Sequence, residues 1–339
     1  GQWQRFSHDP EQPSVLSDNT VRAIFEHPTG TRWVGTAGGL DRLDLETGAW
    51  RSYVHDPEDP TSLTSCSITA LNRSGPGHLW VGTAGGLNRF DINVEISIRY
   101  EVRPGRQQSL SANLVRSVLE GTPGEVWIGT DAGLDRLDLH AGTVSHYRYD
   151  PSDPHSLGAS AVRALMQDRA GALWVGTYGG GLNRFDPRSR GFTRFGISDG
   201  LPGNVIYGIT EDRLGHLWLS TNRGLTRFEP QSTELKNYDA SHGLQGDDFN
   251  GGAYFRSTDG TLFFGGNNGF NSFVPEGLAD NSHVPPVVLT SFTKLNQPVD
   301  LASPLDSVDE LELHHRDYVI GFEFAALDFT EPEENRYRY

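Results

Sequence analysis

Three arginines recur at one step of an internal repeat, and their chemistry suits the binding of an anion. Arg22, Arg116 and Arg163 occupy equivalent positions in a chain of 339 residues with a formal charge of −16, and Tyr207 takes that position in a later copy. Converging guanidinium groups bind carboxylate or sulfate through paired hydrogen bonds. The spacing therefore predicts a pocket for an anionic ligand. The alternative is that each arginine pairs with an acid of a neighbouring repeat and merely fills space.

A second set of variable residues follows the second strand expected in each copy. The first two copies have small residues there, Ala37 and Ala84, whereas later copies have large or polar ones: Asp131, Tyr178, Asn222, Arg223, Asn267 and Asn268. Residues that only build the scaffold are the same in every copy, whereas these residues differ between copies, as an asymmetric pocket requires. The tyrosine rings could stack on a sugar face. The candidate ligand-binding residues are Arg22, Arg116, Arg163, Tyr207, Asp131, Tyr178, Arg223 and Asn267.

The sequence holds no catalytic motif of weight. It lacks a nucleophile elbow, a zinc-binding His-Glu-x-x-His and a phosphate-binding loop. The residues expected at the innermost step, which include no histidine or acid, are Arg22, Thr69, Arg116, Arg163, Tyr207 and Gly252. Asp-rich loops at residues 56–59 and 150–153 could bind calcium, but their proline spacing favours turns in which aspartate caps its own backbone. We expect no enzyme activity in this part of the chain, no cofactor and no metal.

The repeat that positions these residues is 44 to 47 residues long. Its landmark is Gly-x-x-Trp, with tryptophan at 33, 80, 127, 174 and 218, and Phe263 in a sixth copy. Each copy contains four short β-type runs separated by turns, such as 21–25, 31–36, 40–45 and 49–54, and no helical period. Four strands in about 45 residues predict a blade of a β-propeller. The tryptophan would fill the wedge between neighbouring blades.

A second series of arginines precedes an acid by two residues in the third strand of each copy. The five are Arg42, Arg89, Arg136, Arg184 and Arg227. Residues two apart share one face of a strand, so we expect a ladder of structural arginine–carboxylate pairs.

The ends of the chain bear on the number of blades. Residues 2–10 match the outermost strand of a copy, and the sixth copy stops at 273–275 without a clear outermost strand of its own. Trp3 to Phe6 could pair with the blade that holds Phe263, which would close a ring of six and remove two sheet edges. Alternatively this strand ends a seventh blade of the intact protein.

From residue 277 the composition changes. We expect an all-β protein with a propeller over 1–276, a polar linker over 277–286 and an incomplete immunoglobulin-like sandwich over 287–339, because a sandwich needs about 100 residues. Its missing strands would leave an apolar face uncovered, which suggests a homodimer through this domain. The acidic charge argues against a nucleic-acid partner. No apolar run is long enough to span a membrane, so membrane attachment would use segments outside this chain.

The repeat reads V-R-A-I-x-E-x-x-x-G-x-x-W-V-G-T-x-G-G-L-x-R-L-D and resembles the two-component regulator propeller family over about residues 1–275. The tail from 285 to 339 is similar to the triple-tyrosine domain, an immunoglobulin-like sandwich. The resemblance implies a periplasmic sensor region whose intact receptor signals through a cytoplasmic histidine kinase or diguanylate cyclase. Some members sense oligosaccharides, so it implies a small-molecule or oligosaccharide ligand.

Two other functions remain open. One is a scaffold that binds only protein. The other is a lyase of the streptogramin-lyase kind, whose propeller repeats look partly alike. A lyase would need a histidine and an acid at the ring centre, and it needs no triple-tyrosine-like domain.

Overall fold

A computed structural model describes residues 5–9, 15–27, 30–75, 77–106, 108–278, 286–300, 305, 308 and 310–326. The chain divides into two compact units, Gly1–Gly277 and Leu278–Tyr339. The described helices are three short 3-10 turns: η1 (Ile197–Asp199), η2 (Ala240–His242) and η3 (Pro275–Gly277). None of them has the length or apolar character of a membrane span.

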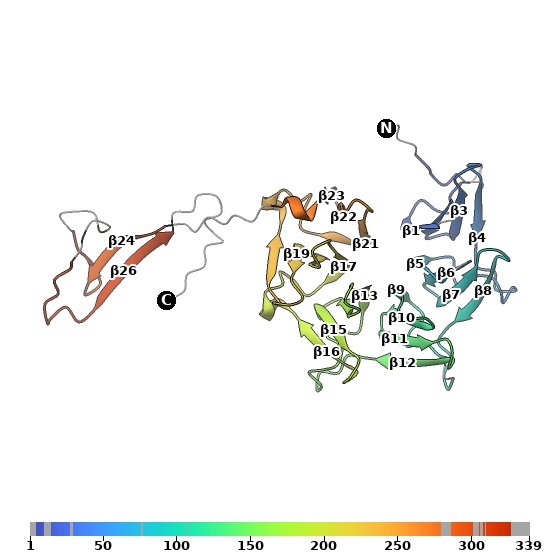
Figure 1. The fold of residues 1–339 in the computed structure, drawn as a ribbon, viewed down its shortest axis with the longest axis horizontal. Helices are drawn as coiled ribbons and strands as arrows, with labels where there is room; N and C mark the ends of the chain where they lie inside the picture. Colours follow the sequence, from blue (N-terminus) through green and yellow to red (C-terminus); the bar gives the residue numbers. More distant parts are fainter. Residues whose placement is uncertain are drawn as a thin grey trace. The chain divides into compact units, whose positions relative to one another are not determined.

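The first unit is a ring of antiparallel sheets, and this confirms the expected β-propeller (Figure 1). Blade 1 holds β1 (Val21–His27), β2 (Thr31–Thr36), β3 (Leu40–Asp44) and β4 (Trp50–Tyr53). Blade 2 holds β5 (Ile68–Arg73), β6 (His78–Thr83), β7 (Leu87–Asp91) and β8 (Ile96–Tyr100). Blade 3 holds β9 (Val115–Glu120), β10 (Glu125–Thr130), β11 (Gly133–Asp138) and β12 (Thr143–Tyr147).

The ring continues with three further sheets. Blade 4 holds β13 (Val162–Gln167), β14 (Leu173–Thr177), β15 (Leu182–Asp186) and β16 (Gly191–Phe195). Blade 5 holds β17 (Ile206–Glu211), β18 (Leu217–Thr221), β19 (Gly224–Phe228) and β20 (Leu235–Tyr238). Blade 6 has three strands among the described residues: β21 (Phe249–Arg256), β22 (Leu262–Gly266) and β23 (Gly269–Phe273).

The core lies between consecutive blades, as the tryptophan spacing predicts. Trp33 packs with Leu40 of its own blade and with Leu63, Ile68 and Phe90 of the next. The five landmark tryptophans are all at most 5% exposed. The glycine two residues after each of the first four tryptophans permits this approach: a Cβ added at Gly35 would lie 2.5 Å from Ile68 Cγ2.

The expected ladder of arginine–carboxylate pairs forms only in part: Arg42 lies 3.7 Å from Glu95, and Arg136 pairs with Glu125, and neither acid belongs to the third strand. Four of the arginines, Arg42, Arg89, Arg136 and Arg184, lie over the tryptophan rings, with Arg42 5.8 Å from the Trp33 centroid and Arg184 5.6 Å from that of Trp174. The acids turn the other way and cap the following turn: Asp44 accepts hydrogen bonds from two backbone N–H groups at 3.0 and 2.9 Å. These bonds, above all that from Thr47, lower the pKa of Asp44. Backbone donors close by in sequence thus outcompete the arginine.

A buried acid ties blade 1 and blade 3 to the loop that enters each of them. The carboxylate of Asp135, which is 0% exposed, accepts hydrogen bonds from the backbone and hydroxyl of Ser111 at 2.8 and 3.0 Å. His146 Nδ1 lies 2.7 Å from its other oxygen. Asp41 of blade 1 bonds Ser17 in the same way. Each network satisfies an acid that burial would otherwise destabilise.

The expected pairing of the opening strand falls mainly outside the described residues, which do not include Trp3 and Gln4. Within them, Phe6 packs edge to face against Trp50 of β4, with ring centroids 5.3 Å apart. The described part of this segment therefore contacts blade 1.

The second unit is described over one sheet, with the order β25 (Gln297–Pro298), β24 (Val287–Lys294), β26 (Ile320–Ala326). Phe292 is buried there against Phe322. Other apolar side chains on these strands are 41–61% exposed: Val287, Leu289, Ile320, Phe322 and Phe324. These side chains give the described sheet an apolar surface, while the incomplete sandwich and the triple-tyrosine assignment stay predictions.

Candidate ligand site

The residues at the axis are carried by irregularities in the innermost strands. In β1, Val21 pairs with Thr36 and Ala23 with Gly35, so Arg22 is an extra residue without a pairing partner on β2. The same register shift leaves Thr69, Arg163 and Tyr207 without a pairing partner in their blades. In blade 3 the unpaired residue is Arg116, which lies between the paired residues Val115 and Ser117. A β-bulge re-aims the side chain of its extra residue. The sequence position that these residues share in each repeat is therefore the extra residue of a β-bulge.

The bulges meet in a pocket of about 540 Å³ at the axis of the propeller. Its lining brings together Val21, Arg22, Thr69, Arg116, Arg163, Asn250, Gly251, Gly252 and Ala253. The three predicted arginines, from blades 1, 3 and 4, thus share one cavity. Three guanidinium groups around one space form an anion-binding arrangement.

Two of these arginines have partners in the protein. Arg22 donates from Nη1 to Ser67 Oγ at 2.7 Å. Arg116 donates from Nε and Nη2 to the two oxygens of Asp131, at 3.0 and 3.2 Å. The alternative of an arginine held by an acid is thus realised at Arg116, although Asp131 belongs to its own blade rather than a neighbouring one. Asp131 orients this guanidinium instead of contacting the cavity.

Arg163 differs because its charge is poorly compensated. Its Nε is buried and has no hydrogen-bond partner among the described residues. Its guanidinium carbon lies 5.1 Å from the ring centroid of Tyr178. Burial, and then repulsion by Arg116, lower the pKa of Arg163. An anion in the pocket would supply the missing acceptor and offset this repulsion.

Tyr207 lies beside the pocket. A Cβ added at Gly251 would stand 3.8 Å from its ring, and burial, followed by the charge of Asp248, raises the pKa of Tyr207. The pocket lining does not include Arg223 or Asn267. Arg223 is exposed in the turn after β18, and Asn267 donates to Asp248 at 3.3 Å. Their assignment to a ligand stays a prediction without support from this cavity.

The sequence analysis missed the contribution of blade 6. There Phe249 pairs with Gly266 and Tyr254 with Phe264, so four residues, Asn250 to Ala253, stand opposite the single residue Gly265. All four residues of this wide bulge line the cavity. Gly252, expected at the ordinary step, is one part of it. The Asn-Gly-Gly sequence was the available signal, since glycines inside a strand often mark a bulge.

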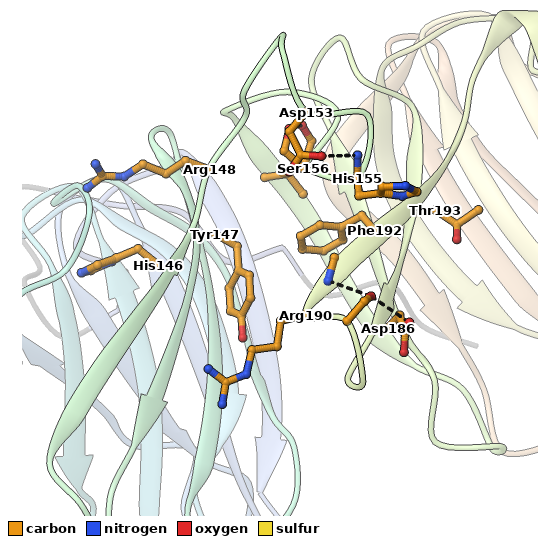
Figure 2. Close-up of a pocket in the computed structure, with 13 residues that line it drawn as sticks. His146, Tyr147, Arg148, Asp153, His155, Ser156, Asp186, Arg190, Phe192 and Thr193 are labelled. Carbon is orange, nitrogen blue, oxygen red and sulfur yellow. Dashed lines mark hydrogen bonds between the residues drawn. The ribbon is translucent and has the colours of Figure 1, made fainter.

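A second hollow, of about 670 Å³, lies on the rim between β12 and β16 (Figure 2). Tyr147 and Phe192 pack edge to face in it, 5.9 Å apart. Its acids are engaged in local turns: Asp153 accepts from the His155 backbone at 2.8 Å, and Asp186 from the Ser189 hydroxyl at 2.8 Å. The rim hollow does not bring several arginines together in one cavity, as the axial pocket does. We therefore take the axial pocket as the candidate site.

The Asp-rich loops use their oxygens for turns. Asp56 accepts from the backbone N–H of Glu58 at 2.9 Å, and Asp59 from that of Thr61 at 2.8 Å. Within the described ranges no group of three or more His, Cys, Asp and Glu side chains could hold a metal ion. The hydrogen bonds therefore agree with turn chemistry.

The chain is similar in sequence to known signalling proteins. A family profile described as "Two component regulator propeller" matches residues 156–179 and 200–223. A histidine kinase of Formosa agariphila, "Histidine kinase P4", is 26% identical over 148 residues, which cover 42% of this chain and 11% of that protein.

Solved structures agree on the fold. The extracellular domain of a one-component system from B. thetaiotaomicron has a TM-score of 0.61 and 21% identity, covering 93% of this chain and 42% of its own. The extracellular domain of a hybrid two-component system from that organism has a TM-score of 0.55 and 24% identity, covering 94% and 48%. The chain thus spans less than half the length of either.

An enzyme shares the fold too. Virginiamycin B lyase from Staphylococcus aureus, solved with quinupristin, has a TM-score of 0.56 and 17% identity, covering 79% of this chain and 87% of its own. At this identity the likeness concerns the fold alone. In the two matched repeats, and in its sheets of antiparallel strands, the first unit of this chain is similar to two-component regulator propellers.

Proposed function

We propose that this chain is the extracytoplasmic ligand-sensing region of a membrane-bound two-component receptor, and that its ligand binds in the axial pocket. The family match and the likeness to extracellular domains of signalling systems support the sensor role. The intact receptor would lie in the inner membrane, with this region in the periplasm, and signal through a histidine kinase or a diguanylate cyclase.

The ligand is proposed to be an oligosaccharide that carries carboxylate or sulfate groups. The single observation behind this choice is the convergence of Arg22, Arg116 and Arg163 on one cavity, with Arg163 Nε lacking a partner within the described part of the chain. Tyr178, 51% exposed beside Arg163, offers a ring face for a sugar. A charge-assisted pair is stronger than a neutral hydrogen bond, so the acidic group would dominate affinity.

A thermal-shift panel tests this proposal. Acidic oligosaccharides, uronate-containing or sulfated, should raise the Tm of the chain, whereas neutral oligosaccharides of equal length should not. The Arg163→Ala variant should lose the shift, and Arg106→Ala, which changes an exposed arginine outside the pocket, should retain it. If Arg116→Ala and Arg163→Ala lower the Tm of the free protein but keep the ligand-induced shift, these arginines are structural and the site is wrong.

The alternatives are a protein-binding scaffold and a lyase. The residues that line the axial pocket include no histidine and no acid, which disfavours acid–base catalysis there. A scaffold would show no shift with any oligosaccharide. We further propose that the second unit pairs with a second copy through its exposed apolar side chains.

A further inference from the structure

We propose that Asn250 is a site of spontaneous deamidation, in which the backbone nitrogen of Gly251 displaces the side-chain amide, and that the carboxylate formed becomes an internal anion of the axial pocket. Both residues lie in the wide bulge of β21 and line the same cavity as Arg22, Arg116 and Arg163. The chemistry of the modification stands by itself, whereas its effect on ligand binding rests on the proposed function.

The sequence places a glycine directly after Asn250, and asparagine followed by glycine is the pair that deamidates most readily. The side-chain carbonyl carbon of an asparagine stands within reach of the next backbone nitrogen, and a side chain on the next residue hinders the approach. Glycine has no Cβ and adopts backbone conformations that other residues avoid. The chain contains Asn-Gly at two places, Asn250–Gly251 and Asn268–Gly269, both in blade 6.

The backbone around Asn250 has the freedom that formation of a succinimide ring requires. Residues 250–253 stand opposite Gly265 alone, so the pairing of β21 with β22 is interrupted there. Asn250 and Gly251 are both exposed, and Gly252 has a φ of 77°. Because a bulge leaves its extra residues unpaired, turning the peptide unit after Asn250 disturbs no strand pair.

Asn268 presents the same dipeptide in a restrained setting. Its backbone N–H donates to Gln245 Oε1 at 2.8 Å, and its side-chain Nδ2 donates to the Gln245 carbonyl oxygen at 3.2 Å. Gly269 pairs with Gly266 across the turn that joins β22 to β23. The amide that would have to rotate is thus held by a hydrogen bond. The two sites therefore differ in structure and not in the reacting dipeptide.

The positive charge of the axial pocket favours the reaction at Asn250. The attacking species is the Gly251 nitrogen after loss of its proton, and the attack places negative charge on the side-chain oxygen of Asn250. Nearby cations stabilise both the ionised nucleophile and the oxyanion that develops. Arg163 brings an unused donor to this cavity, because its buried Nε has no hydrogen-bond partner among the described residues.

The reaction balances with water as its co-reactant. Hydroxide removes the Gly251 N–H proton, the nitrogen forms a bond to Cγ of Asn250, and the Cγ–Nδ2 bond breaks. The leaving nitrogen takes a proton from water and departs as ammonia, which regenerates hydroxide. Water then opens the succinimide at either carbonyl and leaves aspartate or isoaspartate. One neutral amide has become one carboxylate, and nothing is oxidised or reduced.

The product carboxylate would share the cavity with three guanidinium groups. Burial, and then the like charge of Arg116, lower the pKa of Arg163, and an anion at residue 250 opposes that repulsion. The same anion uses the positive charge on which an acidic ligand depends. We therefore expect deamidation to stabilise the free propeller and to weaken the binding of an acidic oligosaccharide, so that the response of the receptor declines as the protein ages.

Peptide mass spectrometry of the chain, aged in mildly alkaline buffer, tests the site. The peptide with Asn250 should show amide-to-acid conversion about tenfold faster than the peptide with Asn268, and the two should convert at equal rates in the urea-unfolded chain. Gly251→Ala is the matched variant, since a Cβ there would meet only the Tyr207 ring at 3.8 Å. It should slow conversion at residue 250 about tenfold, and Arg163→Gln should slow it about threefold. Neither variant should alter conversion of Asn268.

Asn250→Asp tests the consequence without ageing. It should raise the Tm of the free chain and reduce the Tm shift that trigalacturonate produces. Gln108→Glu, which makes the same change of charge at an exposed position outside the pocket, should leave that shift unchanged.

Equal conversion of Asn250 and Asn268 in the folded chain, or no effect of Gly251→Ala, would overturn the modification site. This comparison within the parent chain needs no substitution, so it holds even where a variant fails to fold. An undiminished trigalacturonate shift in Asn250→Asp would overturn the consequence. If no acidic oligosaccharide shifts the Tm of the parent while Asn250 converts rapidly, the proposed function fails and the modification site stands.

Discussion

Asp135 shows how a single buried side chain holds a blade to its neighbour in sequence. Its two oxygens receive the backbone and hydroxyl of Ser111 and face His146, while solvent does not reach it. Removing a buried acceptor leaves its donors unsatisfied, and this costs more than the bond itself contributes.

We therefore expect Asp135→Ala to lower the free energy of unfolding by about 3 kcal/mol. Urea denaturation followed by tryptophan fluorescence measures the change. Glu46→Ala, at an exposed turn position, is the control and should stay within about 0.5 kcal/mol of the parent. Similar values for the two variants would show that water replaces the lost acceptor.

A second prediction concerns acid stability at Asp239, the residue that caps η2. Bonds from the Ser241 hydroxyl and from His242 hold the pKa of Asp239 at about 2. Because the folded pKa lies below the unfolded value near 4, the contribution is complete above pH 4 and is lost as the pH falls toward 2.

Asp239→Asn should therefore lower the Tm at pH 6 and lose less Tm between pH 4 and pH 2 than the parent does. Scanning calorimetry across this range measures both effects. Ser241→Ala removes one cause of the shift and should reproduce part of the change. Parallel Tm curves for Asp239→Asn and the parent would contradict the assignment.

At the scale of the element, the glycine two residues after each of the first four landmark tryptophans sets the spacing between blades. A Cβ added at Gly176 would lie 2.7 Å from Ile206 Cγ2 of the next blade. Overpacking of a well-packed interface costs about 1–3 kcal/mol.

Gly176→Ala should therefore destabilise the propeller by about 2 kcal/mol in urea denaturation. Gly246→Ala is the matched control, because a Cβ there would meet only the Asn268 amide at 3.4 Å. An equal effect of the two substitutions would mean that the blades separate without cost.

The strands themselves were accessible to sequence reasoning, whereas their irregularities were not. The repeat predicted four strands per blade because tryptophan, glycine and turn residues recur at fixed offsets, and blades 1 to 5 confirm it. The bulge at Arg22 depends on register between strands, which one copy of a sequence does not encode. The expected arginine–carboxylate ladder formed only in part for the same kind of reason: two residues on one face of a strand need not pair, and Asp44 instead accepts hydrogen bonds from the backbone of the following turn.

At the scale of the whole molecule, the chain joins a propeller to a second unit with an exposed apolar sheet. The sequence located this change of character near residue 277 from composition alone. It also brought the three axial arginines into one site, because equivalent repeat positions must face one axis. It could not show the wide bulge of blade 6 or the unequal pairing of the arginines, since both arise from contacts particular to one blade.

If the second unit mediates self-association, replacing Val287 and Phe324 with serine should shift the chain toward monomer in sedimentation velocity. The two side chains are 61% and 43% exposed, so the substitutions remove apolar surface rather than core. Ile98→Ser, at a 55% exposed position of blade 2, is the control and should leave the sedimentation coefficient unchanged. A monomeric parent chain would refute self-association through this sheet.

The bulges at the axis also bear on how such a domain diversifies. Each axial side chain stands on a residue that no partner strand pairs with, while the residues on either side keep the sheet in register. A mutation at one of these positions can therefore alter what the ring recognises and leave the blades intact. Duplication of a repeat supplies the four-stranded scaffold, and the residue at each axial position can then change independently of the others. Related chains can then share one propeller architecture and bind different ligands through different axial residues.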